Sequence, residues 1–156
     1  EWDAAMVDGV AELQTGSALD AAAAALLYVH ALDTGALADA REHLQRMLDL
    51  NHLLPDPAQH EALFEAAFFE AWLREDPTAA AQFMPEKPDV GLGEKVTLLK
   101  AQAALALRRE AWAEAEAFLT EAVKENQQSI APGAAVITAE FLQQMRAFIP
   151  ANENSR

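Results

Sequence analysis

The sequence predicts an all-α protein of antiparallel helix pairs, and three observations support that prediction. Apolar residues make up 52% of the 156 residues, and alanine, the strongest helix former, supplies many of them. Valine, isoleucine and threonine are too sparse and scattered to form strands. One helix-pair pattern also occurs twice, at residues 25–51 and 98–126, and repeats of this size are typical of helical solenoids.

The two copies share their internal spacing. With Ala40 aligned to Ala115, four further pairs fall into register: Leu44 with Leu119, Met47 with Ala122, Leu48 with Val123, and Ala24 with Leu99. Stacked helix pairs build extended binding surfaces. The repeat therefore predicts architecture more sharply than chemistry.

The first helices follow from capping signals. A leading helix is predicted over residues 3–14. Ser17 followed by Asp20 resembles a capping box, which satisfies backbone N–H groups at a helix start, and predicts a second helix that runs to about Leu32. Gly35 suits the left-handed residue that follows a helix end.

Apolar stripes predict the next two helices. Residues 36–51 place one set on a single face: Leu37, Ala40, Leu44, Met47 and Leu48. Residues 58–74, after Asp56 as N-cap, carry the widest face, and this helix is expected to be buried on most sides: Leu63, Phe64, Ala67, Phe68, Phe69, Ala71 and Trp72. The carboxylates on that helix, Glu61, Glu65 and Glu70, are expected to form its solvated face.

The rest of the chain is predicted to hold a short helix from Pro77 to about Met84 and three longer helices, at about 94–109, 111–126 and 132–148. Residues 85–93, with two prolines and two glycines, form a hinge candidate. This loop is not expected to be a domain boundary, because either half alone would be very small. The prediction is one domain over residues 1–150 and a frayed tail over 151–156.

The charge limits the partners. The net charge is −14, from 25 acidic and 11 basic residues. Such a surface repels phosphate backbones and anionic membranes, so neither nucleic-acid binding nor membrane binding is expected. A protein or peptide partner remains, including a basic one.

Location is predicted from what the chain lacks. It has no cysteine, which excludes disulfides and fits a reducing compartment. No apolar run approaches the ~20 residues that span a bilayer; the longest covers residues 21–29. We expect a cytoplasmic domain without direct membrane insertion. Because the chain begins at Glu1 without a methionine, we interpret it as a fragment. A preceding region that tethers the domain to a membrane is therefore an open alternative.

No catalytic, metal-binding or cofactor-binding residue is predicted. No two of the four histidines stand at the i, i+4 spacing of a helical zinc site. His60 and Glu61 begin like the zinc-protease motif HExxH, but Phe64 occupies the position of its second histidine. Trp72 and Trp112 lie on apolar stripes and are expected in the core, whereas Trp2 is a candidate anchor.

The two copies resemble the tetratricopeptide repeat over roughly residues 20–127. Gly35, Ala40 and Leu44 match its turn glycine, first alanine and large apolar position in the first copy, and Ala103, Ala115, Leu119 and Ala122 fit the second. Tyr28 stands where the family prefers glycine, Glu110 replaces the turn glycine, and the closing proline is missing. The resemblance implies a short right-handed superhelix with a leading helix, a C-terminal capping helix and a concave groove.

That resemblance implies a non-catalytic domain that mediates protein–protein interaction through its groove. The predicted groove residues come from the first helix of each copy: Ala25, Val29, Leu32, Thr97, Lys100, Ala104 and Arg108. Their apolar members Ala25, Val29 and Leu32 suit either of two roles: packing under the leading helix, or a groove for an apolar helix or peptide. A homodimer stays open as well, because an alanine-rich face and an aromatic terminal helix are both candidate contacts.

A second resemblance is to the soluble helical region that follows the membrane core of bacterial site-2-protease-like metallopeptidases. It is carried by the segments EWDAAMVDGV, YVHALDTGALADAREHL, LFEAAFFEAWLREDPTAAAQFM and AQAALALRREAWAEAEAFL. It implies the alternative function: an appended regulatory domain of a membrane-embedded zinc enzyme, with the catalytic residues outside this chain.

Overall fold

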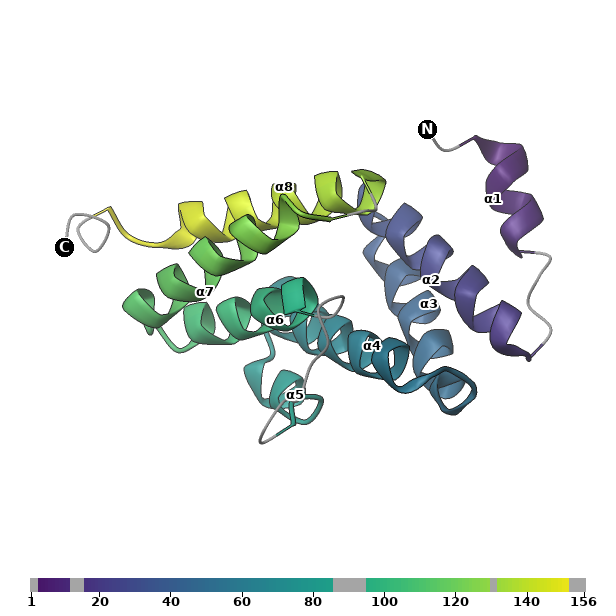
Figure 1. Ribbon diagram of the computed structural model, residues 1–156, viewed down its shortest axis with the longest axis horizontal. Helices are drawn as coiled ribbons and strands as arrows, with labels where there is room; N and C mark the ends of the chain where they lie inside the picture. The colour runs from purple at the N-terminus through teal and green to yellow at the C-terminus, as the bar shows by residue number, and fades with distance from the viewer. Residues whose placement is uncertain (1–2, 12–15, 86–94, 130–131, 152–156) are drawn as a thin grey trace. The chain divides into compact units, whose positions relative to one another are not determined.

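The computed structural model describes residues 3–11, 16–85, 95–129 and 132–151, which form helices and turns without a β-strand (Figure 1). The all-α prediction is therefore confirmed for these residues. The chain divides into two compact units, Glu1–Ala62 (unit 1) and Leu63–Arg156 (unit 2), and the division falls inside the helix α4 (Asp56–Phe68). The prediction of a single domain over residues 1–150 stays a prediction.

Unit 1 is built around a helix hairpin. Its elements before α4 are α1 (Ala4–Ala11), α2 (Ala18–Asp33), α3 (Leu37–Asp49) and the 3₁₀ helix η1 (Asn51–Leu53). α2 and α3 lie side by side, α1 packs on α2, and η1 contacts both hairpin helices (Figure 1). Half of the buried hydrophobic residues in these elements are alanines: Ala21, Ala23, Ala24, Ala31 and Ala40, beside Leu27, Tyr28, Leu44, Met47 and Leu50. These alanines let the two helix backbones approach closely.

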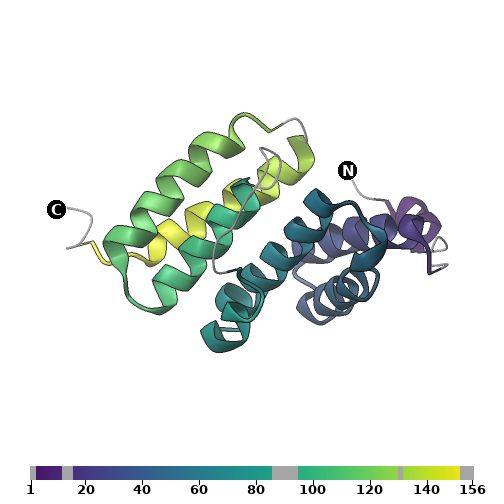
Figure 2. The same cartoon turned by 60° about the horizontal axis from the view of Figure 1, so that its bottom comes forward.

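Unit 2 is a bundle around one buried helix. After the last residues of α4 come the π-helical turn η2 (Phe69–Leu73), α5 (Pro77–Ala81), α6 (Lys95–Arg108), α7 (Trp112–Asn126) and α8 (Pro132–Phe148). α6 packs against α7, α8, η2 and α5, and α7 also packs against α8 (Figure 2). Phe68 meets Phe141 edge-on at 5.2 Å between ring centroids. Trp72 and Trp112 pack against this core, as predicted.

Three helix–turn–helix connections share one turn conformation. Gly35, Glu75 and Glu110 have positive φ angles of 73°, 56° and 58°. Five residues after each comes an alanine with no exposed surface: Ala40, Ala80 and Ala115. The left-handed turn residue brings the second helix back onto the first, and the small alanine sits at their closest approach. The predicted role of Gly35 is confirmed.

Backbone hydrogen bonds make the first and third turns equivalent. The N–H of Ala36 donates to the carbonyl of Ala31 at 2.9 Å, and the N–H of Ala111 donates to that of Ala106 at the same distance. In the middle turn the N–H of Asp76 reaches one residue further back, to Glu70, at 2.8 Å. The recurring turn is compatible with a helical-repeat fold.

The π-helical turn explains the longer reach of the middle connection. The sequence predicts one regular helix over residues 58–74, but the N–H of Arg74 bonds the carbonyl of Phe69, five residues earlier instead of four. Such a turn inserts one extra residue into the helical ladder. The consecutive Phe68 and Phe69 are both buried beside it. The apolar spacing carried no signal for this insertion, because Phe69 simply widened the stripe.

The other predicted helix bounds agree to within a few residues, and the last helix, 132–148, matches α8. The leading helix contains α1, but its predicted end at residue 14 lies outside the described residues, as do Trp2, nearly all of the 85–93 loop and most of the 151–156 tail. Ser17 is the N-cap of α2, although it makes no side-chain capping bond. The Asp20 side chain makes a different bond at this helix start: it accepts from the N–H of Gly16, the residue before the N-cap, at 2.6 Å.

Candidate functional site

The predicted groove residues of unit 1 lie on α2. Ala25, Val29 and Leu32 are half-buried and stand within two turns of one another. They border a more exposed row on the same helix, where Leu19 keeps 55% and Leu26 49% of its surface. These three residues therefore lie beside exposed apolar side chains; that they contact a partner stays a prediction.

The predicted groove residues of unit 2 lie on α6 and offer much less surface. Thr97, Lys100 and Ala104 are 7%, 4% and 0% exposed, and Arg108 is half-buried. Their burial follows from the position of α6, which packs against α7, α8 and η2. That these four residues contact a partner stays a prediction.

Lys100 is held inside unit 2 by an ion pair. Its Nζ lies 2.6 Å from Oε1 of Glu65 and 4.3 Å from the centre of the Phe68 ring. The expectation that Glu65 and Glu70 lie on a solvated face is wrong, because their side chains are only 14% and 13% exposed. A buried ammonium needs a carboxylate beside it, since burying either charge alone is costly. The sequence separation of 35 residues concealed this pair.

Arg108 caps the end of the π-helical turn. Its Nε and Nη2 donate to the carbonyls of Ala71 and Trp72, both at 2.8 Å, and its Nη1 lies 3.3 Å from a Glu75 carboxylate oxygen. The guanidinium also stacks over Trp72 at 4.7 Å and Phe148 at 5.3 Å. Helix-end carbonyls lack backbone partners, so these contacts satisfy them. Arg108 therefore has a structural role that sequence reasoning missed.

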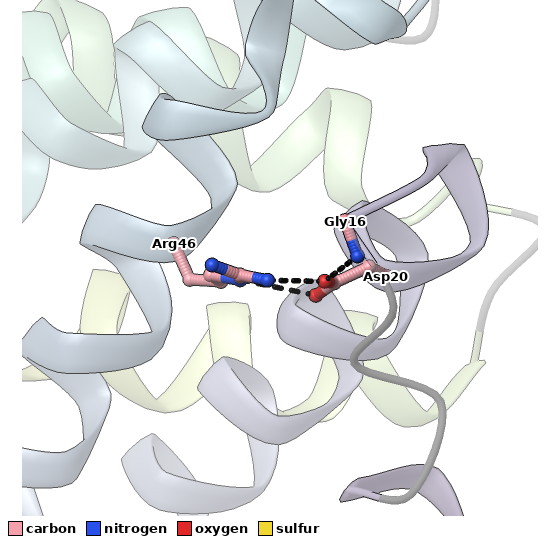
Figure 3. A network of polar contacts seen from close by, with 3 residues as sticks. All are labelled: Gly16, Asp20 and Arg46. Carbon is pink, nitrogen blue, oxygen red and sulfur yellow. Dashed lines mark hydrogen bonds and ion pairs between the residues drawn. The ribbon is translucent and has the colours of Figure 1, made fainter.

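Unit 1 contains a buried carboxylate, Asp20, paired with Arg46 (Figure 3). Asp20 has no exposed surface, and the guanidinium donates to both its oxygens, at 3.2 Å and 2.5 Å. The Arg46 hydrogen bonds lower the pKa of Asp20; burial acts in the opposite direction, and the Gly16 N–H lowers it further. Because a general acid needs a raised pKa, this carboxylate is suited to hold the hairpin together and not to donate protons.

The second hairpin has an ion pair at the same two positions with the charges exchanged. The alignment of Ala40 with Ala115 places Lys95 at the position of Asp20 and Glu121 at that of Arg46. Nζ of Lys95 lies 2.9 Å from Oε1 of Glu121 and 3.3 Å from Oε1 of Glu125. Hydrogen bonds to these carboxylates raise the pKa of Lys95. Both hairpins thus fasten the start of the first helix to the end of the second.

The described residues include a cavity but no cluster of metal-binding side chains. They contain no group of three or more histidine or acidic side chains placed to hold a metal ion. A cavity of about 400 Å³ lies between α7 and α8 and has no acidic or histidine residue in its wall: Val123, Asn126, Gln127, Ala139, Leu142, Gln143 and Arg146 line it. Within the described ranges, no helix combines the length and apolarity required to cross a bilayer.

Comparison with known proteins finds no match: no family model, no curated protein and no solved structure is similar to this chain. The described geometry alone therefore defines the class of protein. It is an all-α protein in which a helix hairpin of one turn geometry recurs.

Proposed function

We propose that this chain is a non-catalytic helical-repeat domain that binds protein, with its hairpins stacked as a short right-handed superhelix like that of tetratricopeptide repeats. Three turns with a left-handed residue at Gly35, Glu75 and Glu110 support the repeat. Repeats of this kind present long helical surfaces, which suit binding more than catalysis.

The observation that carries the proposal is an uncovered apolar face on α2. Leu19, Ala22, Leu26 and Val29, here named the α2 stripe, follow one another at helical spacings of three and four residues. Leu19, Ala22 and Leu26 are exposed, and Val29 is half-buried. The stripe runs about 15 Å along the helix. This row of apolar side chains supports the proposal, because contiguous exposed apolar surface is typical of contact sites.

The two ion pairs that involve the buried Asp20 and Lys100 also favour binding over catalysis. Asp20 is neutralised by Arg46, and Lys100 by Glu65. Each of these charges is used to join two helices. A catalytic acid or base would have to reach a substrate, and each of these four side chains is already paired with another one.

Site-specific photo-crosslinking tests the proposed function. A photoreactive residue at position 26 should form adducts with another protein in cells that make the full chain. The matched control is position 136 on α8, because Val136 is a comparably exposed apolar residue, at 59%. Adducts at position 26 should disappear when Val29→Glu places a charge in the stripe.

Adducts of equal yield from positions 26 and 136, or none from position 26, would contradict a binding role for α2. The alternative function, an appended regulatory domain of a membrane zinc metallopeptidase, stays a prediction, because no contact among the described residues favours it.

A further inference from the structure

The α2 stripe differs sharply from the matching face of α6. The repeat alignment pairs Ala22 with Thr97, Leu26 with Ala101, and Val29 with Ala104. On α6 these positions are 7%, 0% and 0% exposed. On α2 the leucine of the middle pair keeps 49% of its surface. One face of the same hairpin is therefore covered in unit 2 and open in unit 1.

The covering of α6 indicates what shape fits the open face. α6 is covered by helical segments of its own unit, namely α7, α8 and η2. α2 packs against α1, α3 and η1, and these elements leave its stripe uncovered. Ala22, between the two leucines, has a small exposed side chain, and a partner helix can approach closely at such a position. A helix is therefore the occupant that this hairpin already accommodates elsewhere in the chain.

The charge of unit 1 indicates the chemistry of that helix. Residues 1–62 contain eleven acidic residues and two arginines, a net charge of −9, whereas residues 63–156 contain fourteen acidic and nine basic residues, a net charge of −5. One of the two arginines, Arg46, is engaged with Asp20.

Exposed acids lie on the three helices of the hairpin region: Asp3 and Asp8 at α1, Asp33 at the end of α2, and Asp39, Glu42 and Asp49 on α3. An apolar stripe in such surroundings is complementary to a helix with apolar residues on one face and Lys or Arg beside them.

We propose that the α2 stripe binds a basic amphipathic helix of another protein, an inference that rests on the proposed function. The apolar face of the ligand covers Leu19, Leu26 and Val29, and its basic residues meet the exposed acids of α1 and α3. A second copy of this chain is a poorer occupant, because it would bring two units of charge −9 together.

Peptide binding to the full chain tests this inference. The probe is a fluorescent amphipathic helix with leucines on one face and lysines elsewhere, and the matched peptide has glutamates in place of the lysines. The lysine peptide should bind, and its affinity should fall as salt rises from about 0.05 to about 0.5 M, because salt screens exposed charges. The glutamate peptide should not bind.

Two variants locate the binding. Leu19→Gln with Leu26→Gln keeps the net charge and alters only exposed positions, so the fold should persist; the affinity for the lysine peptide should fall at least about ten-fold. Val136→Gln, the control on α8, should bind like the unaltered chain. Equal binding by all three proteins would show non-specific attraction and overturn the inference.

Two further outcomes overturn the inference while leaving the proposed function intact. Binding of both peptides at the stripe would remove the requirement for a basic ligand. Self-association that is lost with Leu26→Gln, measured by sedimentation equilibrium, would make a second copy the occupant. The proposed function itself fails only in the crosslinking experiment, which depends on no chosen peptide.

Discussion

The hairpins α2–α3 and α6–α7 have nearly the same backbone and different chemistry at matched positions. Their turns have φ angles of 73° at Gly35 and 58° at Glu110, and Ala40 and Ala115 are both fully buried. The residue before each second helix is also superimposable in conformation: φ and ψ are −81° and 72° at Ala36, and −82° and 70° at Ala111.

Three differences stand on this common backbone. The turn residue is glycine in one hairpin and glutamate in the other. The ion pair between the helix ends joins Asp20 to Arg46 in the first hairpin and Lys95 to Glu121 in the second hairpin. The acidic and basic positions are exchanged between the two. The first helix has an open apolar face only in unit 1. The comparison teaches that turn geometry and buried alanines maintain the hairpin, while charge polarity and surface are free to vary.

The largest effect is expected at Lys100, whose counterpart in the first hairpin is Ala25. Lys100→Met keeps most of the aliphatic packing but leaves the carboxylate of Glu65 without its 2.6 Å partner. Removing one member of a buried pair costs about 3 kcal/mol, so the free energy of unfolding should fall by that order. Chemical denaturation measures it.

The matched double variant separates charge from packing. Adding Glu65→Leu to Lys100→Met should restore most of the lost stability, because well-packed apolar pairs replace buried ion pairs at little cost. Equal instability of the single and double variants would indicate that Lys100 acts through its packing on Phe68 alone.

Exchanging the ion pair of unit 1 tests whether the two hairpins are equivalent. Asp20→Lys and Arg46→Glu should each lower the thermal midpoint, because each places like charges side by side. The combined variant reproduces the polarity of Lys95 and Glu121 and should unfold at a higher temperature than either single variant. Recovery should be incomplete, because lysine cannot accept the hydrogen bond that Asp20 receives from Gly16. A double variant that unfolds at no higher temperature than the single variants would contradict the equivalence of the two hairpins.

Exchanging the turn residues should give smaller and opposite effects. Glu110→Gly relieves the left-handed strain and should stabilise unit 2 by about 1 kcal/mol, while Gly35→Ala should destabilise unit 1 by about the same amount. A Cβ added at Gly35 meets no atom within 4 Å, so backbone conformation alone sets its cost. Denaturant titrations of both variants measure the change in the free energy of unfolding. A change of the same sign in both variants would contradict the shared turn conformation.

The smallest expected effect is a difference in pH dependence. The pKa of Asp20 is lower in the folded protein than in the unfolded chain. Asp20 therefore adds to the free energy of unfolding above about pH 4, and this added stability is lost as the pH falls through the folded pKa. Because the folded pKa of Lys95 is raised, its contribution is present below about pH 10.4 and is lost as the pH rises through the folded value.

Thermal melts across this pH range should therefore show that the midpoint of Asp20→Asn falls less at acid pH than that of the unaltered chain. The midpoint of Lys95→Met should fall less at alkaline pH. Unchanged profiles in both variants would contradict these assignments.

Much of the fold could be predicted from the sequence, because helix stripes and turn residues are local signals. The stripe of α3, the turn at Gly35 and the span of α8 all came from spacings within a few residues. The π-helical turn could not, because Phe69 continues an apolar face in either geometry. The Asp20–Arg46 pair was missed for a different reason: Asp20 also fits a cap, and its partner is 26 residues away.

The candidate site was predicted only in part, because burial depends on contacts between residues far apart in the sequence. Val29 and Lys100 occupy similar stripes in sequence, and only packing decides that the α2 residue borders open surface while the α6 residue is buried. One usable signal was present: the repeat alignment exchanges the charges of two positions together, Asp20 with Lys95 and Arg46 with Glu121. Paired reversal of this kind indicates spatial contact.

The most direct test of the central claim, that binding uses the uncovered face of α2, is hydrogen–deuterium exchange of the full chain with and without the lysine peptide. Bound peptide should slow exchange in residues 18–33 and leave the equivalent helix, residues 95–108, unchanged. Slowing confined to residues 95–108, or equal in both helices, would contradict the claim.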